Sequence, residues 1–328
     1  MSSVEVPERG LKAGLNTGSS AQVAKRLIAI FLLIGLGVSG QASAQDLEPR
    51  RWSHLPIGLN VVGIGYTYTD ANIYFNPFWN ITNGTAQINT LGLGVIHNFD
   101  LAGKSARFSL LLPYSSGRWD GDVDGEFRQI ERHGVGDPRL RFSVNLYGAP
   151  ALKGSEFERY QADHTTNTVV GASLAMTVPL GKYCDDCLIN IGNNRWSARP
   201  QIGVVHTRGP WSFELTGSVF LFTDNNNFLR DVVLKQETLY AAQTHAVYSF
   251  KSGLWFSLST GYGSGGRIFI DKQKTQFEVD NWLWAAGFGF PVGKTQSLHL
   301  TWISGRTQND VGRDSDNLLL RWSARWAN

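Results

Sequence analysis

Cys184 and Cys187 flank two carboxylates, Asp185 and Asp186, in a polar stretch of the chain. A CxxC spacing suits redox chemistry in a reducing compartment, or metal binding where further ligands are present. The sequence gives evidence of neither setting. Because cysteines of secreted proteins oxidise, we expect Cys184 and Cys187 to form a structural disulfide in a loop. The carboxylates between them form only a weak cation signal, so neither a metal site nor a cofactor is predicted.

Two further patterns are compatible with chemistry but are weak. An acidic run is spaced like Ca²⁺ ligands: Asp120, Asp122, Asp124 and Glu126. It lacks the full loop pattern, which favours a solvated loop. His97 with Ser109 or Ser115 would suit a lipid hydrolase, yet no spacing sets a nucleophile beside a base and its orienting group. We therefore predict no catalytic residue.

The elements that position these residues follow from a period of two. In 138–147, Leu140, Phe142 and Val144 alternate with Arg139 and Arg141. Such alternation indicates β-strands, and about ten residues suffice for a tilted strand to cross a bilayer. Twelve strands are predicted, at 58–70, 85–99, 106–115, 138–147, 168–179, 196–206, 211–223, 239–250, 254–262, 282–290, 298–306 and 317–326.

The two faces of these strands distinguish a membrane barrel from a soluble sandwich. Bulky apolar residues oppose mostly Gly, Ser and Thr, whereas a sandwich would oppose an apolar inner face to a charged outer one. Charged residues make up only 17% of the chain, and its mean hydropathy of −0.17 excludes several apolar helical spans. We predict an all-β fold, a transmembrane antiparallel β-barrel of about 12 strands.

The connections alternate in length, which gives independent support. Short links (100–105, 207–210, 251–253, 291–296) follow even strands, and long polar links follow odd ones, with 148–167 as the exception. Outer-membrane barrels have short periplasmic turns and long outer loops. We therefore expect both termini in the periplasm of a Gram-negative cell, outer-membrane lipid and lipopolysaccharide around the barrel, and the barrel-assembly machinery as a partner.

The face opposite the lipid should line a lumen. Eight of its charged or titratable residues are predicted there: Arg139, Arg141, Arg199, Glu214, His245, His299, Arg321 and Arg325. Such a wall would favour anionic or polar solutes in an open pore. The same arginines could instead fill a narrow barrel by hydrogen bonding to Glu214, because twelve strands lie between filled and open barrels.

The N-terminal region reads as a secretion signal. An apolar run at 27–38 follows Lys25 and Arg26 and precedes Ala42-Ser43-Ala44, which predicts a signal peptide over 1–44 and a barrel over 45–328. The apolar run is too short to span a bilayer. Its removal leaves 26 basic and 25 acidic residues, so nucleic acid is not an expected partner.

Three short motifs accompany this layout: Gly134-Val135-Gly136-Asp137-Pro138, the strand end Val178-Pro179-Leu180-Gly181, and the hairpin at 287–293. With twelve strands, they resemble the outer-membrane transporter family of the phenol-degradation meta-pathway. The resemblance implies a transporter-like barrel for hydrophobic or aromatic compounds. The C-terminal Trp326-Ala327-Asn328 departs from the terminal aromatic residue common in bacterial barrels.

The resulting hypothesis is a channel, not an enzyme, through which small solutes cross the outer membrane passively, inward or outward. The alternatives are an outer-membrane lipid-modifying enzyme, which would cleave lipid in detergent, and a sealed structural or binding barrel, which would neither conduct nor catalyse.

Overall fold

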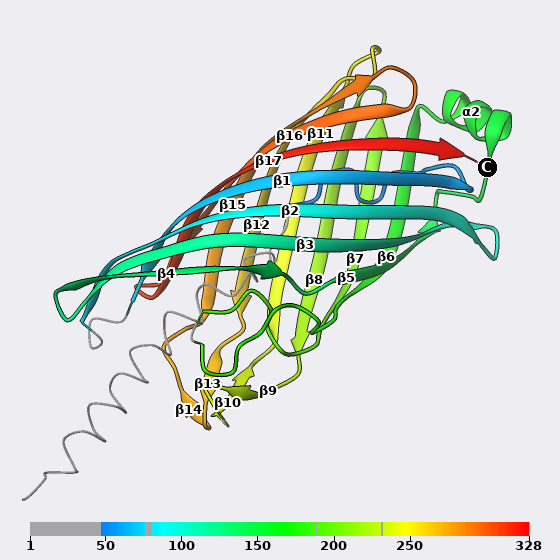
Figure 1. Cartoon of the computed structure of the whole chain (residues 1–328). Coiled ribbons are helices and arrows are strands. Elements are labelled where there is room, and N and C mark those ends of the chain that lie inside the picture. The colour runs from blue at the N-terminus through cyan, green and yellow to red at the C-terminus, as the bar shows by residue number, and fades with distance from the viewer. Residues whose placement is uncertain (1–46, 76–79, 188, 231, 328) are drawn as a thin grey trace, which may run out of the picture.

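The computed structural model describes residues 47–75, 80–187, 189–230 and 232–327 of the chain (Figure 1). Twelve strands form the barrel: β1 (Leu59–Tyr74), β2 (Ile81–Leu101), β3 (Lys104–Val123), β5 (Arg139–Tyr147), β6 (Thr166–Thr177), β7 (Ser197–Arg208), β8 (Trp211–Phe222), β11 (Leu239–Ser249), β12 (Trp255–Gly265), β15 (Val279–Val292), β16 (Gln296–Thr307) and β17 (Gly312–Ala327). Their pairing is antiparallel throughout, and the β1–β17 and β2–β3 pairs close the sheet. The predicted fold class and strand number are confirmed.

The outer wall of the barrel is apolar. Alternate side chains along each strand point outward and are exposed in the isolated chain, for example Leu91 and Leu93 of β2 and Leu318 and Leu320 of β17. Aromatic side chains lie toward both ends, such as Trp211 and Trp326 at one and Trp282 at the other. Lipid hydrocarbon would cover this belt, and closure leaves no unpaired edge within it.

The predicted loop 116–137 is largely strand, which corrects the sequence interpretation. β3 continues to Val123 and pairs with β4 (Glu126–Val135), a polar strand that lies outside the closed ring. Asp124 and Gly125 form the two-residue turn, with φ values of 53° and 82°. Positive φ at both central residues defines the hairpin turn that Asp-Gly favours. The acidic run thus lies on a β-hairpin rather than in a solvated loop.

Two smaller structures lie at opposite ends of the barrel (Figure 1). The exceptional link 148–167 contains the helix α2 (Gly154–Asp163). At the long-loop end, a second sheet is formed by β9 (Asn225–Phe228), β10 (Val232–Gln236), β13 (Ile268–Ile270) and β14 (Gln273–Lys274). Phe228, Leu234 and Ile268 form its apolar core. In the described residues, no helix is both long and apolar enough to cross a bilayer.

Candidate functional site: the barrel lumen

The chain segment 47–58, here called the lumenal segment, lies inside the barrel. Its first residue, Leu47, packs against Leu283, Ala285 and Ile303 on the inner wall. Its last residue, Gly58, donates its backbone N–H to the carbonyl of Asn98, 2.8 Å away, where β2 approaches its short turn. The segment therefore runs through the interior before the chain enters the wall as β1.

A partly buried ion pair holds the start of the lumenal segment. Both guanidinium nitrogens of Arg141 on β5 donate to the Glu48 carboxylate, at 2.7 and 3.0 Å. Arg51 pairs with the same carboxylate. The backbone N–H of Arg50 donates to Glu214 Oε1 on β8, at 2.8 Å. Two of the predicted lumen residues, Arg141 and Glu214, thus bind this segment, whereas one of the two alternatives from the sequence has the arginines bonded to Glu214.

Trp52 is the central anchor of the lumenal segment. Its side chain is fully buried, and its indole N–H donates to Thr216 Oγ1 at 2.7 Å. The ring lies against β6 and β7 where these strands carry Gly171 and Gly203. A Cβ at either glycine would come within 2.3 Å of the indole. Glycine at these two positions therefore creates the space that Trp52 fills.

The base of the lumenal segment binds the short-turn end of the barrel. His54 donates through Nε2 to the Pro150 carbonyl at 2.7 Å, and the Gln161 amide of α2 lies 3.2 Å from Nδ1. The His54 ring packs edge-on against Phe157 and Tyr160 of α2. Burial lowers the pKa of His54, although the bond to Pro150 opposes this shift. Burial is the larger effect, so the neutral ring is favoured.

The lumenal segment covers the inner wall on one side of the barrel and leaves the opposite side open. Lumen-facing residues of β5 to β12 beneath it are buried, as Ser173, Gln201 and Ser259 illustrate. The opposite wall, formed by β16, β17, β1 and β2, keeps its inward residues partly exposed, including Thr67 and Thr301. We call this second wall the open half.

Two cross-strand pairs of glycines lie on the inner wall of the open half. Gly63 pairs with Gly94 and Gly65 pairs with Gly92 across β1 and β2. A Cβ at Gly94 would meet no atom closer than 3.8 Å. Gly65 and Gly94 thus have room for a side chain, so the absence of one widens the lumen there.

The structure separates the remaining predicted lumen residues between the two halves. Arg199 and His245 are buried under or beside the lumenal segment: Arg199 donates to Ser218 Oγ at 3.3 Å, and His245 Nδ1 lies 2.7 Å from Ser259 Oγ. His299, Arg321 and Arg325 belong to β16 and β17 of the open half. Arg139 begins β5 and is half-buried, with its backbone paired to Thr177.

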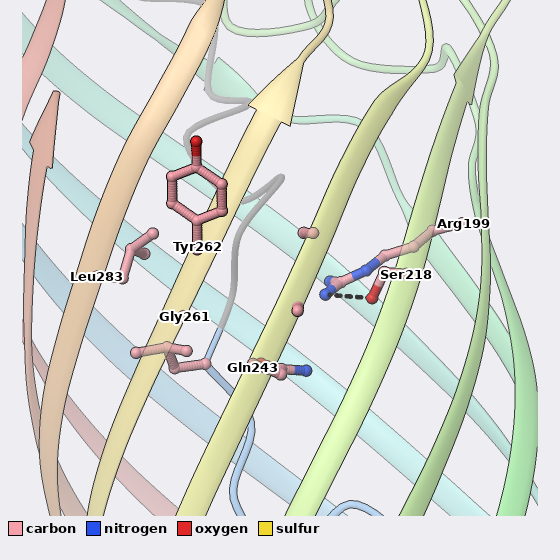
Figure 2. A pocket seen from close by; sticks show the side chains of 9 residues that line it. Arg199, Ser218, Gln243, Gly261, Tyr262 and Leu283 are labelled. Carbon is pink, nitrogen blue, oxygen red and sulfur yellow. Dashed lines mark hydrogen bonds between the residues drawn. The ribbon is translucent and has the colours of Figure 1, made fainter. Parts of the chain in front are cut away.

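A small recess lies between Leu47 and the inner wall of β7, β8, β11, β12 and β15. Figure 2 shows Arg199 and Gln243 among its lining side chains, with Arg199 bonded to Ser218. Leu283 and Gly261 contribute an apolar side. The recess beside the lumenal segment is thus of mixed polar and apolar character.

At the long-loop end, the 178–196 segment is fixed by side chains of the predicted motifs. Asp137 accepts hydrogen bonds from the backbone N–H of Gly181 and from the backbone and side-chain N–H groups of Asn193, each at 2.8 Å. Cys184 and Cys187 form a disulfide. The guanidinium of Arg230 bonds to Asp186 and lowers the pKa of that carboxyl. Asp185 and Asp186 therefore face a cation from the protein itself.

Sequence reasoning missed the lumenal segment and its residues Arg50 and Trp52. Their positions depend on contacts with strands 100 to 200 residues away, such as the bond from Trp52 to Thr216. The available signal was an isolated tryptophan shortly before the first strand, together with lumen-facing glycines at Gly171 and Gly203.

This fold, a closed twelve-stranded barrel with an apolar outer belt, defines an outer-membrane β-barrel protein. Residues 63–313 match the family described as "Putative MetA-pathway of phenol degradation", and the chain belongs to that family. An outer-membrane channel from Pseudomonas putida F1 is similar in structure: 20% identity, a TM-score of 0.72, and coverage of 86% of this chain and 100% of that one. The toluene transporter TodX of Pseudomonas putida is more distant, at 10% identity and a TM-score of 0.45 over 88% of this chain and 93% of that one. No curated protein matches the chain.

Proposed function

We propose that the protein is a channel of the outer membrane through which small solutes cross passively along the open half of the lumen. The observation that carries this proposal is the contrast between the two halves: inward residues of β5 to β12 are buried, whereas Thr67, Thr301 and their neighbours remain accessible. The paired glycines of β1 and β2 keep this side wide. Family membership, and the similarity in structure to an outer-membrane channel, add support.

Small hydrophobic or aromatic compounds are the proposed solutes, since the family is associated with a pathway of phenol degradation. Leu319 and Ile303 on the open half provide apolar surface beside polar residues such as Thr301. A lumen of this mixed character suits molecules that combine an apolar body with a polar group.

Single-channel recording in planar bilayers tests the proposal directly. The purified full chain should give discrete conductance steps. Gly94→Leu should reduce the conductance, because it places a side chain in the space beside Gly63. Gly217→Leu is the matched control: it is the same substitution on β8, where a Cβ would meet nothing within 4 Å and the residue faces outward. Absence of steps from the folded wild type would overturn the proposal in favour of a sealed barrel.

The enzyme alternative finds little support in the lumen. His97 points outward and bonds to Asn60, whereas Ser115 bonds inward to Thr90, so the two do not meet. His245 and Ser259 do form a His–Ser hydrogen bond, but His245 is only 2% exposed. A lipid substrate could not reach this pair without displacement of the lumenal segment. We therefore propose a non-enzymatic protein, and a lipase assay in detergent that detects cleavage would contradict this.

We further propose that residues 1–44 are removed as a signal peptide, which leaves two residues before Leu47. The short turns, α2 and the C-terminus lie at one end of the barrel, which we assign to the periplasm (Figure 1). Lipopolysaccharide would then surround the long-loop end, and the barrel-assembly machinery would insert the chain. N-terminal sequencing of protein from isolated outer membranes tests the cleavage site: a chain that begins at Gln45 is expected, and an uncleaved chain would contradict it.

A further inference from the structure

A row of residues crosses the inner wall near the short-turn end of the open half. Trp255 on β12, Gly289 on β15, His299 on β16 and Arg321 on β17 are successive cross-strand partners. The indole of Trp255 lies over Gly289, where a Cβ would come within 2.0 Å of the indole nitrogen. The ring reaches His299 edge-on, with centroids 5.3 Å apart. The row therefore connects an aromatic surface to a cation.

The hydrogen bond between Arg321 and His299 fixes the form of the imidazole. Arg321 Nη2 bonds to His299 Nδ1. A guanidinium has only donors, so Nδ1 must accept this bond. The proton of the neutral ring is then on Nε2, which leaves a second donor in the row. His299 and Arg321 together present N–H groups to the lumen.

Two more arginines lie close to this row, and we call Arg50, Arg321 and Arg325 the arginine cluster. The guanidinium of Arg50, from the lumenal segment, lies over the Trp255 ring at 5.4 Å from its centroid. Arg50 lies within electrostatic reach of Arg325 and of the Glu214 carboxylate, which also accepts a hydrogen bond from the Arg50 backbone N–H. Arg325 donates to the Lys294 carbonyl at 3.2 Å. Within the described residues, none of the three arginines forms a salt bridge with a carboxylate.

The arginine cluster is accessible from the lumen, since all three side chains are exposed although they lie inside the barrel. Glu214 is the one acid among the described residues with a charge interaction with this group, through Arg50. Positive charge is therefore in excess, and a bound anion would relieve the repulsion among the three arginines. Guanidinium groups bind carboxylates through parallel, charge-assisted hydrogen bonds. The cluster therefore has the chemistry of an anion site.

An apolar strip lies directly beside Arg321. Gly65 on β1 is the cross-strand partner of Arg321, and Gly92 on β2 is the partner of Gly65. The ideal Cβ positions of these two glycines lie 3.6 Å from a methyl group of Leu319 and 3.2 Å from one of Leu111. The strip therefore places an apolar surface next to the N–H donors of the cluster.

We propose that the arginine cluster binds the carboxylate of a small organic anion whose apolar body lies on the strip formed by Gly65, Gly92, Leu319 and Leu111. The inference deepens the proposed channel function, because it places a solute-binding site in the open half. It also gives the lumenal segment a role in recognition, since Arg50 comes from that segment. Binding does not require conduction, so the two can be tested separately.

Titration calorimetry on the purified full chain in detergent tests the site, with benzoate as the probe. Benzoate should bind, and benzyl alcohol, of similar size but neutral, should bind at least 10-fold more weakly. Arg321→Gln and Arg50→Gln should each weaken benzoate binding by roughly 10-fold or more, the value of a charge-assisted hydrogen bond. Arg208→Gln, at the β7–β8 turn, is the charge-matched control and should leave binding unchanged.

The apolar strip has its own test. Gly65→Leu covers the strip and should weaken binding of benzoate, but not that of inorganic phosphate, which has no apolar body. Equal loss for both anions, or tighter binding of phosphate than of benzoate, would overturn the organic-anion assignment. Unchanged benzoate affinity in both arginine variants would overturn the site itself. Loss of conductance with intact benzoate binding would instead count against the channel function alone.

Discussion

Trp52→Ala should release the lumenal segment from the barrel wall while the barrel itself stays folded. The substitution removes a fully buried indole and its 2.7 Å hydrogen bond to Thr216. Truncation of a buried tryptophan costs about 3–5 kcal/mol, and each 1.4 kcal/mol changes an equilibrium tenfold. The population of undocked segment should therefore rise by roughly 100- to 3,000-fold. The strand pairs do not involve Trp52, so the β-sheet should persist.

Gly203→Ala should also release the lumenal segment, although it changes only the barrel wall. Its Cβ would lie 2.1 Å from the indole nitrogen of Trp52, so the ring must move and lose its bond to Thr216. Overpacking of this kind costs about 1–3 kcal/mol, a shift of roughly 5- to 150-fold. Gly217→Ala is the matched control, because a Cβ there meets nothing within 4 Å.

Amide hydrogen exchange followed by mass spectrometry is the assay for both variants, with single-channel current measured on the same samples. Exchange of residues 47–58 should accelerate in Trp52→Ala and Gly203→Ala, and the current should rise or become noisier as the lumen widens. Gly217→Ala should match the wild type in both. Wild-type protection of 47–58 in Trp52→Ala would refute the claim that this indole anchors the segment.

Three further predictions concern the lumenal segment and the 178–196 segment at the long-loop end. Glu48→Gln removes the bidentate carboxylate partner of Arg141, and loss of one member of a buried pair costs about 3–5 kcal/mol. Amide exchange of residues 47–51 should therefore increase by at least tenfold. Unchanged exchange would mean that the pair does not hold the segment. Asp137→Asn replaces an acceptor of three hydrogen bonds by an amide with one acceptor oxygen, so limited proteolysis within 178–196 should become faster, with no change in the barrel. Burial lowers the pKa of His54, so the neutral ring is the form that stabilises the docked lumenal segment. This stabilisation is complete above the unfolded pKa of about 6.5 and declines as the pH falls below that value. Exchange protection of residues 52–58 should therefore fall between pH 7 and pH 5, and His54→Gln should remove this pH dependence.

The barrel could be predicted from the sequence because one local property determines it. Alternation such as Leu140, Phe142 and Val144 against Arg139 and Arg141 follows directly from a wall with lipid on one side. Strand ends were less predictable: β1, β2 and β3 continue beyond the expected ends of the membrane-crossing segments. These extensions carry polar residues such as Arg118, and their apolar residues Ile73 and Trp119 pack in a buried cluster, so the pattern that indicates a lipid-facing strand is lost although the pairing continues.

β4 was missed for a similar reason. Its sequence from Glu126 to Val135 is rich in charged residues and has no apolar face. The turn signal Asp124-Gly125 was nevertheless present, and a hairpin interpretation of that dipeptide would have predicted the strand. The hydrophobic pattern dominated the interpretation where turn chemistry was the better guide.

The candidate site was predictable only in part. The alternation of residues along each strand shows which arginines face the lumen. It does not show which of them the lumenal segment covers. Arg141 and Arg321 look equivalent in the sequence, yet Arg141 is buried by Glu48 while Arg321 is exposed in the open half. The difference arises from the lumenal segment, whose path depends on long-range contacts such as those of Trp52 with Gly171 and Gly203.

The central claim, that solutes pass along the open half, is tested most directly by cysteine accessibility under current recording. Cys184 and Cys187 are joined in a disulfide, so an introduced cysteine should be the only reactive thiol of the folded protein. Thr67→Cys on the open half should react with a water-soluble methanethiosulfonate and lose current, whereas Ser173→Cys, which is 8% exposed beneath the lumenal segment, should neither react nor change its current. Block through Ser173→Cys with no effect at Thr67→Cys would contradict the account.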